Sequence, residues 1–250
     1  MTVLRYPNAY RGVKKIFIAL LISLGLSVLT YLPYLILAAL GRAYGVLYSS
    51  GYRIFSYVNM VLSFGYLALM LVGALQAGRD EPLFKAAVIP LIGRIALLLI
   101  QDILGYLLPD LIPDPAMTWV FEISSVLLFV CYLWGLLSIV DGGIALAERY
   151  EARGLIRFGK LLIWLIPISC IPQLIARCLD LLQLAGLDPL QTIYDQISYE
   201  QLMTWRQLLQ ICSMVLSMAI LVLLSVFLAR ALKLLRTQAP ESEPETEIAP

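Results

Sequence analysis

Long apolar stretches alternate with short polar segments along almost the whole chain, and six of them hold at most two charged residues each. A helix needs about 20 residues to cross the hydrocarbon core of a bilayer, whereas a barrel strand needs about 10 and alternates in polarity. The pattern therefore predicts an all-α, polytopic membrane protein. Its six transmembrane helices are expected over residues 16–41, 54–78, 86–108, 119–147, 161–182 and 205–229.

The composition agrees with a lipid surrounding. Hydrophobic residues make up 61% of the chain and charged residues 14%, against about a quarter in an ordinary soluble domain. The mean hydropathy is +0.87. A soluble protein of 250 residues lacks the interior to bury so much apolar surface, so the expected partner is the lipid bilayer. The net charge is only +1, which predicts no nucleic-acid partner.

Lysine and arginine are distributed unevenly between the two sides of the predicted helices. Cytoplasmic loops carry an excess of these residues, so the side with more of them should face the cytoplasm. We therefore expect both termini in the cytoplasm, with the chain integral to a bacterial plasma membrane. Thirteen lie on one side (Arg5, Arg11, Lys14, Lys15, Arg79, Lys85, Arg149, Arg153, Arg157, Lys160, Arg230, Lys233, Arg236) and three on the other (Arg42, Arg53, Arg206).

The basic clusters also suggest an internal repeat. Lys15, Lys85 and Lys160 each precede an outgoing helix, and they lie 70 and then 75 residues apart. This spacing predicts three consecutive helical hairpins around an axis along the membrane normal. The domain plan is then a basic segment over 1–15, a six-helix domain over 16–236, and an acidic, Pro/Glu-rich disordered tail over 237–250.

Several kinds of chemistry are excluded by what the sequence lacks. It contains no histidine, which removes Ser-His-Asp systems, HExxH zinc proteases and His-ligated haem. No phosphate-binding glycine motif occurs. The four cysteines are isolated within apolar runs, which is typical of small buried side chains. We therefore expect no catalytic residue, no metal and no cofactor, and hence no enzyme.

Charged residues inside the predicted spans are the main functional lead, because such residues usually pair or line water. Counting about 1.5 Å per residue from the inner boundary, at Lys85 and at Ala147, puts Arg94 roughly 13 Å deep and Asp141 roughly 9 Å deep. The two lie on the helices of one hairpin, so the sequence predicts an Arg94–Asp141 ion pair. A second group lies near the opposite boundary and comprises Asp102, Glu122, Arg177 and Asp180.

These charges leave three functions open. The favoured hypothesis is a non-enzymatic membrane component: an accessory subunit, assembly factor or lipid-interacting scaffold, bound to other membrane subunits or to itself. In that case the charges would be self-neutralising pairs that set helix register. The alternative is a small-solute or ion transporter whose path the six charged residues line. A weaker alternative is an intramembrane enzyme that uses Asp102, Glu122 and Asp141 as paired carboxylates.

Overall fold

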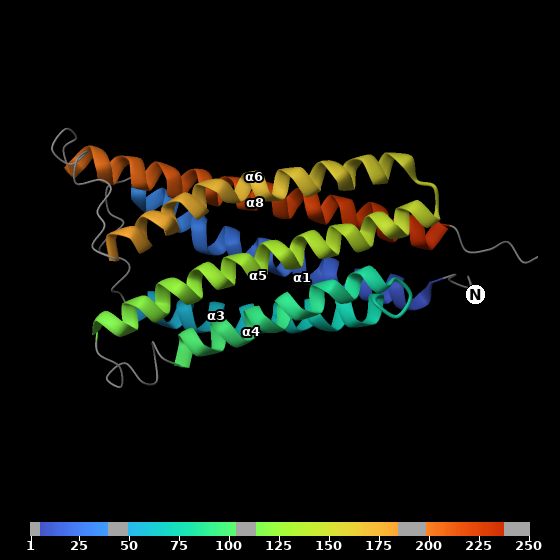
Figure 1. The fold of residues 1–250 in the computed structure, drawn as a ribbon, viewed down its shortest axis with the longest axis horizontal. Helices are drawn as coiled ribbons and strands as arrows, with labels where there is room; N and C mark the ends of the chain where they lie inside the picture. Colours follow the sequence, from blue (N-terminus) through green and yellow to red (C-terminus); the bar gives the residue numbers. More distant parts are fainter. Residues whose placement is uncertain (1–5, 40–49, 104–113, 185–198, 238–250) are drawn as a thin grey trace, which may run out of the picture.

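The computed structural model describes residues 6–39, 50–103, 114–184 and 199–237 (Figure 1). These ranges are helical and contain no strand, which confirms the all-α prediction. The helices are α1 (Pro7–Ala39), α3 (Ser50–Ala77), the 3-10 helix η1 (Pro82–Ala87), α4 (Val88–Asp102), α5 (Asp114–Arg149), α6 (Arg153–Leu184) and α8 (Tyr199–Thr237).

Six segments in these ranges are long and apolar enough to cross a membrane, as predicted. They are Pro7–Thr30, Tyr57–Ala77, Pro82–Asp102, Ala116–Arg149, Arg153–Cys178 and Ile211–Arg236. The helices begin and end at positions that differ from the apolar runs. The first begins at Pro7 rather than residue 16, with proline at a helix start where its missing N–H costs nothing. The expected tail lies outside the described residues apart from Thr237.

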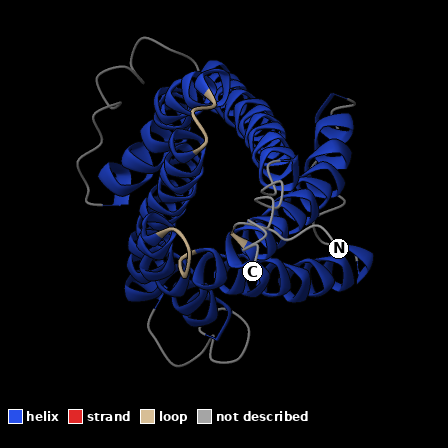
Figure 2. Ribbon diagram, turned by 90° about the vertical axis from the view of Figure 1, so that its right-hand side faces the viewer, coloured by secondary structure: helices blue, strands red, loops and turns tan. Residues whose placement is uncertain are grey.

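The six spans form a ring in chain order (Figure 2). Each helix packs against the next one along the chain, and α8 closes the ring by packing against α1. The start of α1, the turns at 78–81 and 150–152, and the end of α8 lie together at one end, on the right of Figure 1. We call this end the turn end and the opposite one the far end.

Apolar packing concentrates at the turn end. The aromatic ring of Phe227 on α8 lies 2.5 Å from where a Cβ on Gly143 of α5 would be, and 3.0 Å from the same point at Gly159 of α6. The ring of Phe84 likewise lies 2.7 Å from where a Cβ on Gly142 would be. Glycines therefore let two aromatic rings fill the space between helices, and Phe227 brings α5 and α8 into contact across the ring.

Glycine also permits a close crossing between α1 and α3. A Cβ on Gly73 would lie 2.8 Å from the carbonyl oxygen of Gly12, a backbone atom that cannot move alone. Small residues at such a crossing let helix backbones approach, which replaces the hydrophobic drive that lipid does not supply. Gly65 lies on the same helix with nothing within 4 Å of its Cβ position.

Gly73→Ala is expected to lower the free energy of unfolding by about 1–3 kcal/mol, because α1 must shift to admit the methyl group. Gly65→Ala on the same helix is the matched control and should keep or slightly raise stability. Thermal unfolding in detergent measures both. Equal melting temperatures for the two variants would show that the α1–α3 crossing is not tightly packed.

Polar contacts join three elements at the turn end, and we call them the clasp. Asp80 accepts hydrogen bonds from Nδ2 of Asn8 at 3.0 Å and from the backbone N–H of Ala9 at 2.8 Å. Arg149 forms an ion pair with Glu81, Nη2 to Oε2, at 2.6 Å, and its Nη1 donates to the carbonyl of Asp80 at 3.2 Å. A carboxylate 71 residues away thus accepts from one of the free N–H groups that begin α1.

Arg149→Ala is expected to lower the free energy of unfolding by about 1–2 kcal/mol, because it leaves the buried Glu81 carboxylate without its cation. The loss stays moderate because 39% of the Arg149 side chain is exposed, so solvent screens the pair. Arg153→Ala, at an exposed position of the same end, is the control. If both variants melt alike, the clasp contributes nothing to stability.

Candidate functional site

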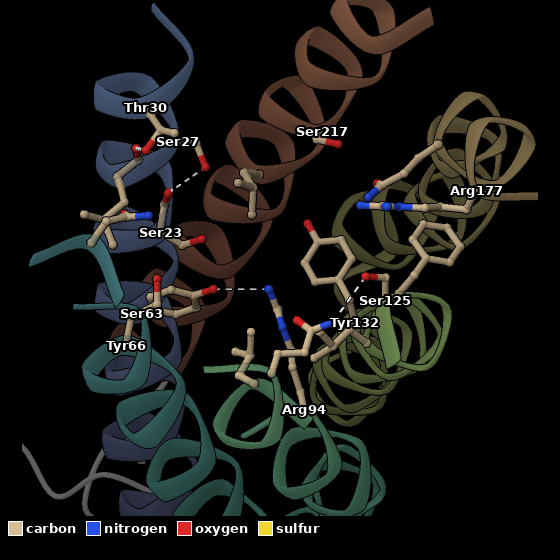
Figure 3. A pocket seen from close by; sticks show the side chains of 18 residues that line it. Ser23, Ser27, Thr30, Ser63, Tyr66, Arg94, Ser125, Tyr132, Arg177 and Ser217 are labelled. Atoms are coloured by element: carbon tan, nitrogen blue, oxygen red, sulfur yellow. Dashed lines mark hydrogen bonds between the residues drawn. The ribbon is translucent and has the colours of Figure 1, made fainter. Parts of the chain in front are cut away.

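A cavity of about 380 Å³ lies inside the ring and is lined by all six spans (Figure 3). Its volume falls within the range typical of ligand pockets, about 300–1,000 Å³. Thirteen of its eighteen lining residues are polar, which is unusual for the interior of a membrane bundle. The polar ones are Ser23, Ser27, Thr30, Asn59, Ser63, Tyr66, Arg94, Gln101, Ser125, Tyr132, Gln173, Arg177 and Ser217.

The helices direct polar side chains inward and apolar ones outward. Two residues along a helix correspond to a rotation of about 200°, so residue i−2 faces away from residue i. Three cavity residues, Ser63, Arg94 and Ser217, follow this rule with outward-facing partners Val61, Ile92 and Val215, which are 64%, 52% and 54% exposed. The outer surface therefore suits lipid, and the cavity suits a polar solute.

Buried apolar side chains lie next to the cavity lining on its turn-end side. Each span has more than one buried residue between the cavity lining and the turn end, and we name one large residue from each, none of them more than 3% exposed. All belong to the continuous hydrophobic core. We call this set of residues the floor; it consists of Leu20, Leu67, Leu91, Leu136, Ile166 and Leu224.

Arg94 reaches into the cavity next to the floor and contacts neutral groups. Its Nη2 donates to the hydroxyl of Tyr66 at 3.2 Å, and its guanidinium carbon lies 4.7 Å from the ring centre of Tyr132 (Figure 3). Ion pairs in the described part of the chain do not include Arg94. It is the thirteenth residue of the 21-residue span Pro82–Asp102, which puts this cation near mid-span.

The predicted Arg94–Asp141 ion pair does not form among the described residues. Asp141 is exposed on α5, nine residues after Tyr132, and nine residues rotate a helix by about 180°. Depth differs too: Gly93 lies against Cys131, whereas Phe84 lies against Gly142. Asp141 is therefore level with η1, about three helical turns closer to the turn end than Arg94. Counting residues from apparent boundaries missed this offset between the two helices.

Of the four residues in the second predicted group, Glu122 and Arg177 form an ion pair. Nη1 of Arg177 lies 3.5 Å from Oε2 of Glu122, with 36% and 22% of the side chains exposed. Asp102 is half-buried at the end of α4, lines no part of the cavity and joins neither of the ion pairs seen in the described ranges. The side chain of Asp180 lies outside the described residues.

Gln101 is the polar neighbour of Arg94 on α4 that does line the cavity. Its Nε2 donates to Oγ of Ser124 at 2.6 Å and to Oγ of Ser125 at 3.2 Å, which fixes it against α5. Arg94 and Gln101 are seven residues apart and share a helix face, whereas Asp102 is rotated from Arg94 by about 80°. The inward stripe of α4 is therefore Arg94, Leu98 and Gln101.

The site residues predicted from the sequence were all charged, so the prediction missed the uncharged residues of the lining. The spacing of polar residues along the helices nevertheless indicates them. Residues that lie four and then three positions apart share a helix face. Three helices repeat this spacing toward the cavity: Ser23, Ser27 and Thr30 on α1; Asn59, Ser63 and Tyr66 on α3; Arg94, Leu98 and Gln101 on α4. Polar stripes of this kind in separate spans predict a shared polar interior.

Comparison of the chain with protein-family models, curated proteins and solved structures found no match in any of the three. Across the residues that the structure describes, no group of three or more Cys, Asp or Glu side chains could hold a metal ion. The cavity and its two arginines are therefore the features from which a function can be inferred.

Cysteine labelling tests whether the cavity holds water. Ser217→Cys should react with a membrane-impermeant maleimide about ten-fold faster than Val215→Cys, because a thiol reacts as the hydrated thiolate. Val215 lies at the same level of α8 but on its outer face, which makes it the matched control. Equal rates at the two positions would contradict a hydrated cavity. The background carries alanine at Cys131, Cys170, Cys178 and Cys212.

Proposed function

We propose that this protein is a small-solute transporter that binds its solute in the central cavity. The observation that carries the proposal is the cavity itself: a polar chamber of about 380 Å³, lined by every span and bordered on its turn-end side by the apolar floor. Secondary transporters place their binding sites near the bilayer midplane, between structural repeats. The mid-span position of Arg94 fits that arrangement.

The floor and the clasp support a gating role for the turn end. The floor consists of side chains from separate helices, such as Leu20, Leu136 and Leu224, so helix tilting can open it without breaking the chain. The clasp joins α1, the 78–81 turn and α5 at the same end through Asp80 and Arg149. In our proposal the turn end faces the cytoplasm, as the lysine and arginine distribution predicts, and it opens when the hairpins rock against one another.

A purely structural role, which the sequence favoured, accounts less well for the cavity. A scaffold gains stability from close packing, and a void in its interior is destabilising. It gains nothing from a cation near mid-span whose contacts are neutral, because such a charge costs free energy in a membrane. The enzyme hypothesis has no support from the site: Glu122 pairs with Arg177, and Asp141 is exposed on α5 nearly 20 residues away.

Flux into vesicles tests the proposal. The full-length protein is reconstituted in phosphatidylcholine vesicles, and uptake of labelled gluconate, inorganic phosphate, glucose and lysine is compared with uptake by protein-free vesicles. We expect faster entry of at least one of these probes. Ser217→Trp should abolish that entry, because the indole fills the cavity, whereas Val215→Trp on the lipid-facing side should preserve it.

Two results would contradict transport. One is uptake of all four probes at the protein-free rate, and the other is unchanged uptake by Ser217→Trp. Size-exclusion profiles of both tryptophan variants show whether they fold, so a loss of flux from misfolding is recognised. If Ser217→Trp misfolds, Ser63→Trp on α3 fills the same cavity from another helix, with Val61→Trp as its control.

A further inference from the structure

We infer that the cavity recognises an oxyanion, a carboxylate or phosphate group on a small water-soluble molecule, and that Arg94 is the residue that holds it. This inference rests on the proposed function, since it names the solute class of the same cavity. None of the eighteen lining residues is acidic, while two of them, Arg94 and Arg177, are permanently cationic. The chamber therefore carries excess positive charge from its own walls.

Arg94 has donors to spare for such a group. A guanidinium carries five N–H donors in a planar fork, and one of the Arg94 nitrogens donates to Tyr66. The ring of Tyr132 covers the guanidinium without using a donor. An arginine inside a membrane span is costly unless a counter-charge compensates it, and the described residues place no carboxylate within 4 Å of Arg94. A bound oxyanion supplies that counter-charge in bidentate geometry.

The two arginines lie at different levels of the cavity. Arg94 is level with Cys131 on α5, because Gly93 contacts that residue, and Arg177 is level with Glu122. Nine residues of helix separate these levels by about 14 Å, with Arg177 nearer the far end. Glu122 partly neutralises Arg177 at 3.5 Å, so Arg177 attracts an anion without binding it as strongly as Arg94. The arrangement leads an anion from the far end to the floor.

The opposite wall, on α1, is suited to the rest of the solute. Ser27 and Thr30 donate their hydroxyl protons to the backbone carbonyls of Ser23 and Leu26, each at 2.8 Å. Their oxygens can therefore only accept from a solute in the cavity. A solute with an oxyanion at one end and hydroxyl groups along its length satisfies both walls. Gluconate has this chemistry, and glucose is its close neutral counterpart.

Thermal unfolding of the purified full-length protein in a neutral detergent tests the inference with gluconate, inorganic phosphate, glucose and lysine as probes. We expect gluconate or phosphate to raise the melting temperature in a saturable way and glucose and lysine to have no effect. Arg94→Gln should weaken the anion's binding by about ten-fold to a hundred-fold, and Arg94→Lys by less, because it keeps the charge but loses the fork. Arg157→Gln, an exposed position outside the cavity, should bind as the unmodified protein does.

Three results overturn the inference: no shift with either anion, equal shifts with glucose or lysine, or an anion shift that survives Arg94→Gln. A further result would also overturn the inference: stabilisation through Arg94 by phosphatidylglycerol and by no soluble anion, because the site then holds a lipid headgroup. If Arg94→Gln misfolds, Arg94→Lys and Arg177→Gln still measure the dependence on the two guanidinium groups.

A failure of the oxyanion inference can be distinguished from a failure of the transport proposal. Flux of glucose or lysine that Ser217→Trp blocks would support a transporter and refute the oxyanion. Arg94-dependent anion binding without flux of any probe would support the oxyanion site and refute transport.

Discussion

Polar side chains in this protein have no favourable place on its lipid-facing surface, and that constraint shapes the whole bundle. The helix faces that carry Val61, Ile92 and Val215 turn outward, so Ser63, Arg94 and Ser217 must turn inward. All six spans contribute polar side chains to the cavity, so six helices in a ring enclose a shared polar interior. The cavity is thus a consequence of how each helix divides its residues between lipid and protein.

The two ends of the ring differ in which side chains fill the space between the helices. Toward the turn end, glycines at positions 12, 73, 142 and 143 let backbones and aromatic rings approach closely, and the floor consists of buried apolar side chains. Farther along, the same helices carry serine, asparagine, glutamine and arginine where the floor has leucine. A bundle packed tightly throughout would have no room for a solute, and one polar throughout would lack a core. The change between the two lies beside Arg94.

The main free-energy cost of this arrangement comes from the charge of Arg94 inside a membrane span. A cation near mid-span is held by a tyrosine hydroxyl and an aromatic ring, both neutral, while Arg177 has Glu122 nearby. The clasp shows how the chain neutralises a buried charge with its own side chains: Glu81 is buried and paired with Arg149. The contrast between the clasp and Arg94 supports a solute as the counter-charge of the cavity.

The local sequence pattern determined the helical class, the six spans and the inward stripes with four- and three-residue spacing. Each of these features depends on the length and polarity of a single helix in lipid. Only the tertiary structure decided which charges meet. The partner of Asp141 was misjudged because Gly93 packs on Cys131 and Phe84 on Gly142, a register between α4 and α5 that no single helix encodes. The capping of α1 by Asp80 was hidden for the same reason, since 71 residues separate the two groups.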